Sequence, residues 1–141
     1  MGVLSQIYNL FQVYTSQHYK SWSGIPINNE CLKGFQKLKV DKTLSYIIFK
    51  MNTSYTEIIV ENTGTSRDFD YFYSELPETE SRFAVYDANN KLVFVTWMPD
   101  AAKTKDKMIF ISSKDALKGS LDGIAVEVQG GDLADIVGAL T

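Results

Sequence analysis

The sequence holds very little of the chemistry on which most enzymes depend. Its 141 residues include one cysteine, Cys31, and one histidine, His18. A single cysteine excludes an intrachain disulfide and a thiolate metal site, and we expect Cys31 to pack as a small apolar residue. His18 has no candidate catalytic partner nearby in the sequence, so acid–base or nucleophilic catalysis lacks its usual residues. We therefore expect a protein that is not an enzyme and that holds no metal or cofactor.

Three further absences narrow the class of protein. No run of about 18 apolar residues is present, so we expect no membrane-spanning helix. The phosphate-binding loop, the dinucleotide fingerprint and the zinc-protease motif are all missing. Lys and Arg number 14 against 17 Asp and Glu, which gives a net charge of −3 and a pI near 5.1. Because nucleic-acid binding needs a basic surface, nucleic acid is not an expected partner.

The residues that are present can build one ordinary domain. Hydrophobic residues make up 45% of the chain, with 8 Phe, 8 Tyr and 2 Trp to fill the space between a sheet and its helices. Apolar spacing and turn residues predict helices at 28–38, 68–76, 102–121 and 132–140, and strands at 45–51, 57–61, 81–87, 91–97 and 125–129. The apolar run 46–49 indicates a central strand that is buried on both faces. Interleaved strands and helices predict an α/β (α+β) fold, with a central mixed sheet flanked by helices on both faces.

The first 22 residues form a segment of their own, followed by a domain over residues 23–141. Apolar residues recur at helical spacing between Val3 and Tyr14, so we expect an amphipathic helix or a disordered extension. The segment lacks the basic start of a secretion signal, and its polar face lacks the Lys and Arg typical of a membrane-surface helix.

The most informative stretch runs from Trp97 to Leu117. Pro99 breaks the preceding strand and Asp100 is the expected N-cap of one long helix. At about 100° per residue, the buried side is expected to carry Ile109, Phe110, Ser113, Ala116 and Leu117.

Met108 and Ile111 are apolar residues on a side of this helix that should face water. They have two interpretations: a contact face for a partner protein, or apolar residues that a loop covers or that water tolerates.

Blocks along the chain resemble the actin-depolymerising factor/cofilin family. They occur in order from residue 23 to about residue 136, and together they are specific. The blocks are Ser23-Gly-Ile25, Phe35-Gln-Lys-Leu-Lys39, Tyr46-Ile-Ile-Phe-Lys-Met51, Leu76-Pro77, Arg82-Phe-Ala-Val-Tyr-Asp87, Trp97-Met-Pro-Asp100, Lys105-Asp-Lys-Met108, Ser112-Ser-Lys-Asp-Ala-Leu117 and Leu121-Asp-Gly-Ile124.

The resemblance implies a cytoplasmic, cytoskeleton-associated protein with the family's fold that binds actin and promotes filament turnover. We expect the protein itself to be monomeric. Carried over position by position, the actin contacts would be Ser23, Gly24, Ile25, Lys105, Lys107, Met108, Ile111 and Ser112.

Two departures from the family pattern concern filaments. The hairpin at 88–91, longer and basic in most relatives, here keeps only Lys91 as a residual filament site, and residues 132–141 contain no Lys or Arg. In this the chain resembles the short-looped members known from some unicellular parasites. We therefore expect monomers to be preferred, with weak filament binding and severing. The first 22 residues also depart from the pattern: either they are an added element, or they are not part of the protein made in the cell.

Regulation and one rival function follow from the same resemblance, and a second rival function follows from the N-terminal segment. The serine at the position of Ser23 is phosphorylated in relatives, and phosphoinositides compete there for the basic pair at Lys105 and Lys107. One alternative is a relative that binds an actin-branching complex, as proteins of the glia maturation factor type do. The other is a phosphoinositide or membrane-surface adaptor that uses residues 1–14.

Overall fold

A computed structural model describes residues 19–20 and 25–140 of the chain. The amphipathic or disordered extension predicted for residues 1–22 therefore lies, apart from two residues, outside the described part. Ser23 and Gly24 also lie outside it.

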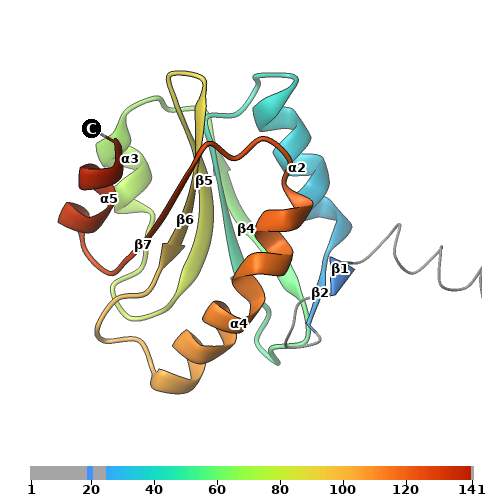
Figure 1. Cartoon of the computed structure of the whole chain (residues 1–141), viewed down its shortest axis with the longest axis vertical. Coiled ribbons are helices and arrows are strands. Elements are labelled where there is room, and N and C mark those ends of the chain that lie inside the picture. The colour runs from blue at the N-terminus through green and yellow to red at the C-terminus, as the bar shows by residue number, and fades with distance from the viewer. Residues whose placement is uncertain (1–18, 21–24, 141) are drawn as a thin grey trace, which may run out of the picture.

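The described strands form one seven-stranded sheet with the order β1-β2-β4-β3-β5-β6-β7 (Figure 1). The strands are β1 (Tyr19–Lys20), β2 (Pro26–Ile27), β3 (Tyr46–Met51), β4 (Ile58–Gly64), β5 (Arg82–Ala88), β6 (Lys91–Trp97) and β7 (Val126–Gly130). Neighbours are antiparallel except that β2 pairs with β4, and β6 with β7, in parallel. The sheet is therefore mixed, as the sequence predicts, and β3 lies at its centre.

Helices cover both faces of this sheet, which confirms the predicted layers. The helices of the described residues are α2 (Asn29–Lys39), α3 (Phe69–Ser74), α4 (Thr104–Ser120) and α5 (Leu133–Leu140). Helices α2 and α4 pack on one face, and α3 and α5 pack on the other (Figure 1). Each face buries its own apolar cluster, so the domain has a core on either side of the sheet.

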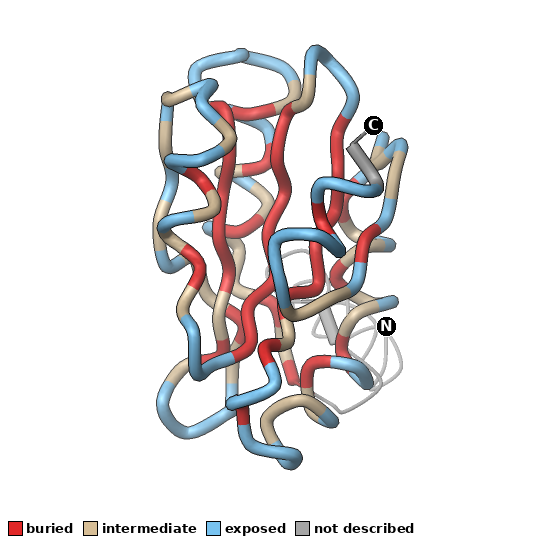
Figure 2. Tube along the Cα trace, turned by 90° about the vertical axis from the view of Figure 1, so that its left-hand side faces the viewer, coloured by how far each residue is buried: buried red, intermediate tan, exposed pale blue. Residues whose placement is uncertain are grey.

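Strand β3 divides its side chains between the two cores. Ile47 and Phe49 join the core under α2 and α4, whereas Tyr46 and Ile48 join the core under α3 and α5. All four are essentially inaccessible to solvent, and Figure 2 shows that buried backbone is concentrated in the strands. Burial on both faces explains why the sequence here is a continuous apolar run rather than an alternating one.

Local signals in the sequence set most of the element ends. The Asn28 side chain accepts a hydrogen bond from the Glu30 amide at 2.8 Å and so caps α2. Asp68 caps α3 in the same way. Asn89 and Asn90 have φ angles of 53° and 71°, the left-handed backbone that a two-residue hairpin requires.

The predicted N-cap of the long helix is wrong. Asp100 lies in a turn closed by the hydrogen bond from the Ala102 amide to the Pro99 carbonyl, at 3.0 Å. Helix α4 begins only at Thr104, after Lys103, which makes no side-chain capping bond. Ala102 is buried, so packing of this turn, and not a capping side chain, decides where the helix starts.

Candidate functional site

Helix α4 is fixed to the sheet by the side that the sequence predicted. Phe110, Ser113 and Leu117 are buried, and the Phe110 ring packs against Phe83 of β5 with centroids 4.7 Å apart. The Ser113 hydroxyl donates to the Ile109 carbonyl at 2.8 Å, which satisfies its polar atom inside the core. The outer side of the helix is therefore held in one orientation.

Two large apolar side chains stand on that outer side. Met108 is 64% exposed and Ile111 is 49% exposed, and one turn of helix separates them, so they form a continuous apolar patch. Ser112 lies beside them and is exposed, with its hydroxyl donating to the Ile109 carbonyl at 3.0 Å. Among the described residues no loop covers this patch, which favours its interpretation as a contact face over that of a covered one.

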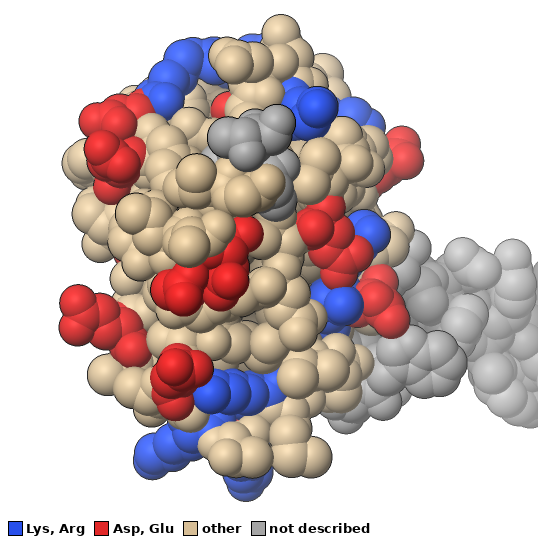
Figure 3. Space-filling model, turned by 60° about the vertical axis from the view of Figure 1, so that its left-hand side comes forward, with Lys and Arg blue, Asp and Glu red and all other residues tan. Residues whose placement is uncertain are grey.

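Lysines surround the start of the same helix. Lys105 is exposed, whereas Lys107 is half-buried and its Nζ donates to the Asp100 carbonyl at 3.3 Å. Lys103 is also exposed and adds a third cation that the sequence analysis did not single out. Figure 3 shows basic side chains at the lower end of the molecule, where α4 begins, and others at its upper end, with most of the acidic side chains in view lying between them.

The described part of the N-terminal motif turns inward. Ile25 is buried in the core under α2 and α4. Its burial ties the entry of the domain to the same core that supports α4, while Ser23 and Gly24 lie outside the described residues.

The expected filament residue is remote from this face. Lys91 is exposed at the β5–β6 hairpin, at the opposite end of the sheet from the start of α4 (Figure 1). A second cation accompanies it, because the Lys42 Nζ lies 3.1 Å from the Asn90 Oδ1 and 3.9 Å from the Asp87 carboxylate. The sequence analysis missed Lys42, which is distant from the hairpin along the chain.

Charged contacts hold both ends of α4. Near its C-terminal end, Lys114 and Lys118 lie 3.0 Å and 2.7 Å from the carboxylate of Glu127 on β7. The hydrogen bond from Lys118, helped by Lys114, lowers the pKa of Glu127 against the opposing effect of burial.

At its N-terminal end, Asp106 accepts the Tyr55 hydroxyl at 2.7 Å and the Ser81 amide at 3.0 Å. In the sequence, Asp106 is marked only as an acidic residue between Lys105 and Lys107, which does not reveal its partners.

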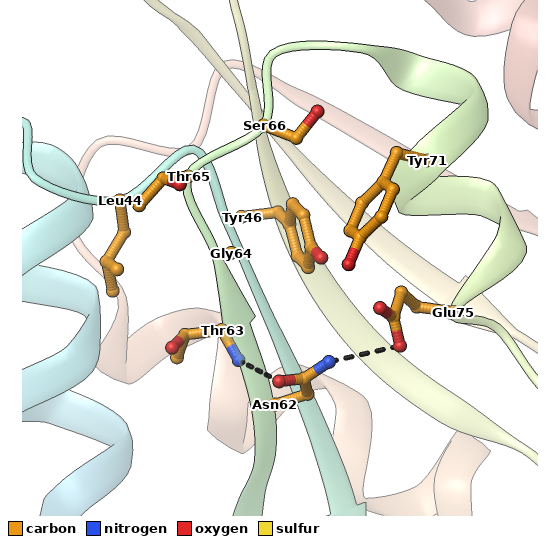
Figure 4. A pocket seen from close by; sticks show the side chains of 9 residues that line it. All are labelled: Leu44, Tyr46, Asn62, Thr63, Gly64, Thr65, Ser66, Tyr71 and Glu75. Atoms are coloured by element: carbon orange, nitrogen blue, oxygen red, sulfur yellow. Dashed lines mark hydrogen bonds between the residues drawn. The ribbon is translucent and has the colours of Figure 1, made fainter.

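The described surface includes the following two pockets. One, of 450 Å³, lies beside α4 and is lined mostly by polar and charged side chains, including Asp106 and Arg82. The other, of 350 Å³, lies between β4 and α3, where the Tyr46 and Tyr71 rings face Glu75 and Asn62 (Figure 4). Glu75 is the charged residue that lines this second pocket, and its carboxylate accepts a hydrogen bond from the Asn62 side chain at 3.1 Å.

Cys31, the one cysteine of the chain, packs in the core as a structural residue. Cys31 is buried, its Sγ lies 3.5 Å from the Ile58 carbonyl, and burial, with the charge of Glu57, raises its pKa to about 12. A thiol held protonated in this way is a poor nucleophile. The described residues contain no cluster of three or more His, Cys, Asp or Glu side chains able to hold a metal ion. Nor do they include a helix long and apolar enough to span a bilayer.

Comparison with known proteins tests the resemblance that the sequence blocks indicate. The model of the cofilin/tropomyosin-type actin-binding protein family matches residues 24–138. Cofilin of Schizosaccharomyces pombe is 43% identical over 124 residues, which cover 82% of this chain and 90% of that protein. Cofilin of Mycosarcoma maydis is 47% identical over 123 residues, covering 81% and 88% of the two chains.

Solved structures agree with the same assignment. The crystal structure of Streptomyces griseoflavus cofilin is similar at a TM-score of 0.77 and 49% identity, covering 80% of this chain and 90% of that one. The solution structure of the actin-depolymerising factor of Toxoplasma gondii is similar at a TM-score of 0.64 and 40% identity, covering 84% and 96%. Because the family model spans most of the chain and several relatives above 40% identity cover over four fifths of it, the protein belongs to the family of cofilin/tropomyosin-type actin-binding proteins.

Proposed function

We propose that this actin-binding protein grips the actin monomer with the outer side of α4. The observation that carries the proposal is the exposure of Met108 and Ile111 on a helix whose other side is locked into the core. A rigid helix that presents two apolar anchors loses little conformational freedom on binding, so most of the contact energy goes into affinity. Ser23 and Gly24 are proposed to complete the contact from the entry of the domain, while Ile25, expected from the resemblance as a contact, is buried and anchors this segment to the core.

The lysines give this grip its electrostatic character. Lys105 and Lys107 flank the apolar patch, and their charge would accelerate association with an acidic surface while the apolar anchors set the dissociation rate. The protein as a whole is acidic, so a local group of lysines is what suits this face to such a partner. The same two lysines are the proposed site of phosphoinositide competition, which a net negative charge keeps weak.

Monomers are proposed to be preferred over filaments. A second contact, on a neighbouring actin subunit, is what stable filament decoration requires. The β5–β6 connection here is a two-residue turn with Lys91 beside it, and residues 132–141 contribute no Lys or Arg. We therefore infer that the protein promotes filament turnover by capturing monomers in the cytoplasm, with weak filament binding and weak severing.

A titration of fluorescently labelled actin monomers with the full chain tests the monomer grip. Saturable binding is expected, and the absence of saturable binding would refute the proposal. A parallel titration with a chain beginning at Ser23 measures whether residues 1–22 alter access to α4. Pelleting with liposomes that contain phosphoinositides separates actin binding from a membrane-surface function, which would persist only in the chain that keeps residues 1–22.

A sedimentation assay with actin filaments tests the preference for monomers. We expect little of the protein to pellet with filaments while the pool of unpolymerised actin rises. Stoichiometric co-pelleting would contradict the preference without touching the monomer grip. Binding to a branching complex instead of actin would support the rival function, and a phosphate placed on Ser23 is expected to weaken monomer binding through charge repulsion.

A further inference from the structure

The first turn of α4 is poorly stabilised by its own sequence. Lys103 occupies the N-cap position without a capping bond, and Lys105 and Lys107 follow within the next turn. Positive charges at a helix N-terminus oppose the helix dipole, and an uncapped N-terminus leaves its amide groups unsatisfied. The lysines proposed to meet actin therefore destabilise the helix that carries them.

Tertiary contacts to Asp106, rather than a cap, tie the first turn of α4 to the rest of the domain. One of its carboxylate oxygens accepts the Tyr55 hydroxyl at 2.7 Å, and the other accepts the Ser81 amide at 3.0 Å. Tyr55 belongs to the β3–β4 turn and Ser81 lies just before β5, so one side chain ties the start of α4 to two separate parts of the sheet. The β3–β4 turn and the start of α4 lie at the same end of the molecule (Figure 1).

The β3–β4 turn is rigid enough to act as an anchor. The Asn52 side chain accepts hydrogen bonds from the Thr56 and Glu57 amides at 2.7 Å and 3.2 Å, and it donates to the Thr56 hydroxyl at 2.8 Å. The backbone N–H of Asn52 also donates to the Glu57 carbonyl at 2.9 Å, which closes the base of the turn.

Tyr55 itself adopts a strained conformation. Its φ is 56°, a left-handed backbone that bulky residues rarely adopt, and such strain persists where surrounding contacts hold it. Tyr55 as a whole residue is 38% exposed, so core packing alone does not explain its place. The hydrogen bond to Asp106 raises the pKa of the Tyr55 phenol, and a phenol is in any case protonated and able to donate at neutral pH.

We infer that Tyr55 and Asp106 are positioning residues for the α4 contact face: their hydrogen bond fixes the first turn of the helix, and with it Lys105, Lys107 and Met108, in the orientation that binds an actin monomer. This inference rests on the proposed function. It adds that affinity depends on two side chains that need not touch the partner.

The test compares Tyr55→Phe with wild type and with Tyr71→Phe. Tyr55→Phe removes only the donating hydroxyl, whereas Tyr71 is an exposed tyrosine of α3 whose hydroxyl makes no hydrogen bond within the described residues. Tyr55→Phe is expected to weaken binding of labelled actin monomers about three- to tenfold, in the range for one ordinary intramolecular hydrogen bond. Tyr71→Phe should bind as wild type does. Equal affinity of all three proteins would overturn the inference.

A double-mutant cycle shows whether Tyr55 acts through Asp106. In an Asp106→Ala background, which retains Met108 and both lysines, Tyr55→Phe should cause no further loss of affinity. An undiminished loss in that background would mean that Tyr55 touches actin directly, and the positioning role would be wrong. A merely structural role is separated by urea unfolding, because Tyr55→Phe would then lower stability where Asp106 is present while leaving affinity unchanged.

Hydrogen exchange in the free protein gives a readout that does not depend on actin. Tyr55→Phe should accelerate exchange of the amides at 107–110, the first within α4 to have intrahelical partners, while amides of α2 stay protected. Unchanged exchange at 107–110 would mean that the Tyr55–Asp106 hydrogen bond does not order the start of α4, and the inference would be wrong. If wild type fails to bind actin monomers, the proposed function fails, whereas faster exchange in the variant would still establish that the hydrogen bond orders the start of α4.

Discussion

Helices α4 and α5 expose similar apolar pairs in opposite electrostatic surroundings. Met108 and Ile111 project from α4, and Leu133 and Val137 project from α5. The pair on α4 has lysines beside it, whereas α5 follows Asp132 and carries Asp135 in its first turn. The comparison teaches that exposed apolar area alone does not choose a partner, because the charges around it decide which surface can approach.

The two helices also begin in different ways. Asp132 caps α5, accepting the Asp135 amide at 3.0 Å, and the Asp135 carboxylate accepts the Gly131 amide at 3.0 Å. These contacts are local and favour the helix dipole. Helix α4 lacks a local cap and depends on Asp106 contacts from distant parts of the chain. This lysine-rich helix end is stabilised by the tertiary structure.

Removing each apolar pair gives the sharpest contrast. Met108→Ala with Ile111→Ala is expected to lower affinity for actin monomers by at least about 100-fold, because central apolar anchors each contribute roughly 2 kcal/mol or more. Leu133→Ala with Val137→Ala should change affinity less than about twofold, a small fraction of an anchor's contribution. Monomer titration and circular dichroism of both variants provide the measurement. Equal losses of affinity in the two double variants would contradict the prediction that α4, and not α5, carries the contact with actin.

Charge reversal on α4 should have a smaller, salt-dependent effect. Lys105→Glu with Lys107→Glu gives the start of α4 the sign of α5, and association with actin monomers should slow by about tenfold or more at low salt. The difference from wild type should shrink as ionic strength rises, because screening weakens exposed charges. Stopped-flow association at several salt concentrations measures it. A slowing that is independent of salt would mean that the lysines act through shape and not through charge.

The contact between α4 and β7 predicts a modest dependence of stability on pH. The folded pKa of Glu127 is lowered by its hydrogen bond from Lys118 and by Lys114. Its contribution is therefore present above the ordinary glutamate pKa and is lost as pH falls through the lower, folded value.

Glu127→Gln should cost less than about 1 kcal/mol at pH 7 because the ion pairs are partly exposed. Its loss of stability relative to wild type should vanish in acid. Urea unfolding at neutral and acidic pH measures both values, with Asp132→Asn, on the α5 side, as a control for removing a carboxylate. A loss that is equal at both pH values would contradict the ion-pair explanation.

Much of the fold could be predicted from short-range patterns. Asn28, Asp68 and the Asn89-Asn90 turn end their elements where the sequence predicts, because capping and left-handed backbone are local properties. The strand at β4 runs to Gly64, beyond the predicted end at residue 61. Its continuation is set by pairing with β3 across an irregularity at Ile48 and Phe49, which a single strand's sequence does not reveal.

The candidate site, like the fold, was predictable from the sequence only in part. Periodicity alone places Met108 and Ile111 opposite Phe110 and Leu117, and their observed exposure and burial agree with it. Neither Tyr55 nor Ser81 could be connected with Asp106 from the sequence, because 51 and 25 residues separate them along the chain. Lys42 was missed at the hairpin for the same reason, at a separation of 48 residues from Asn90.

The sequence by itself determined the class of this protein: one mixed α/β domain of the actin-binding family, poor in catalytic residues, with an apolar pair on the outer side of its longest helix. The mixed domain and the apolar pair follow from composition and from the repeat of the helix, which act between neighbours in the chain, whereas the family follows from the resemblance of the sequence blocks. Only the tertiary structure decided where α4 begins and which distant groups hold it. The partners of a carboxylate such as Asp106 depend on how the sheet brings remote segments together. No local pattern in the sequence shows which segments meet.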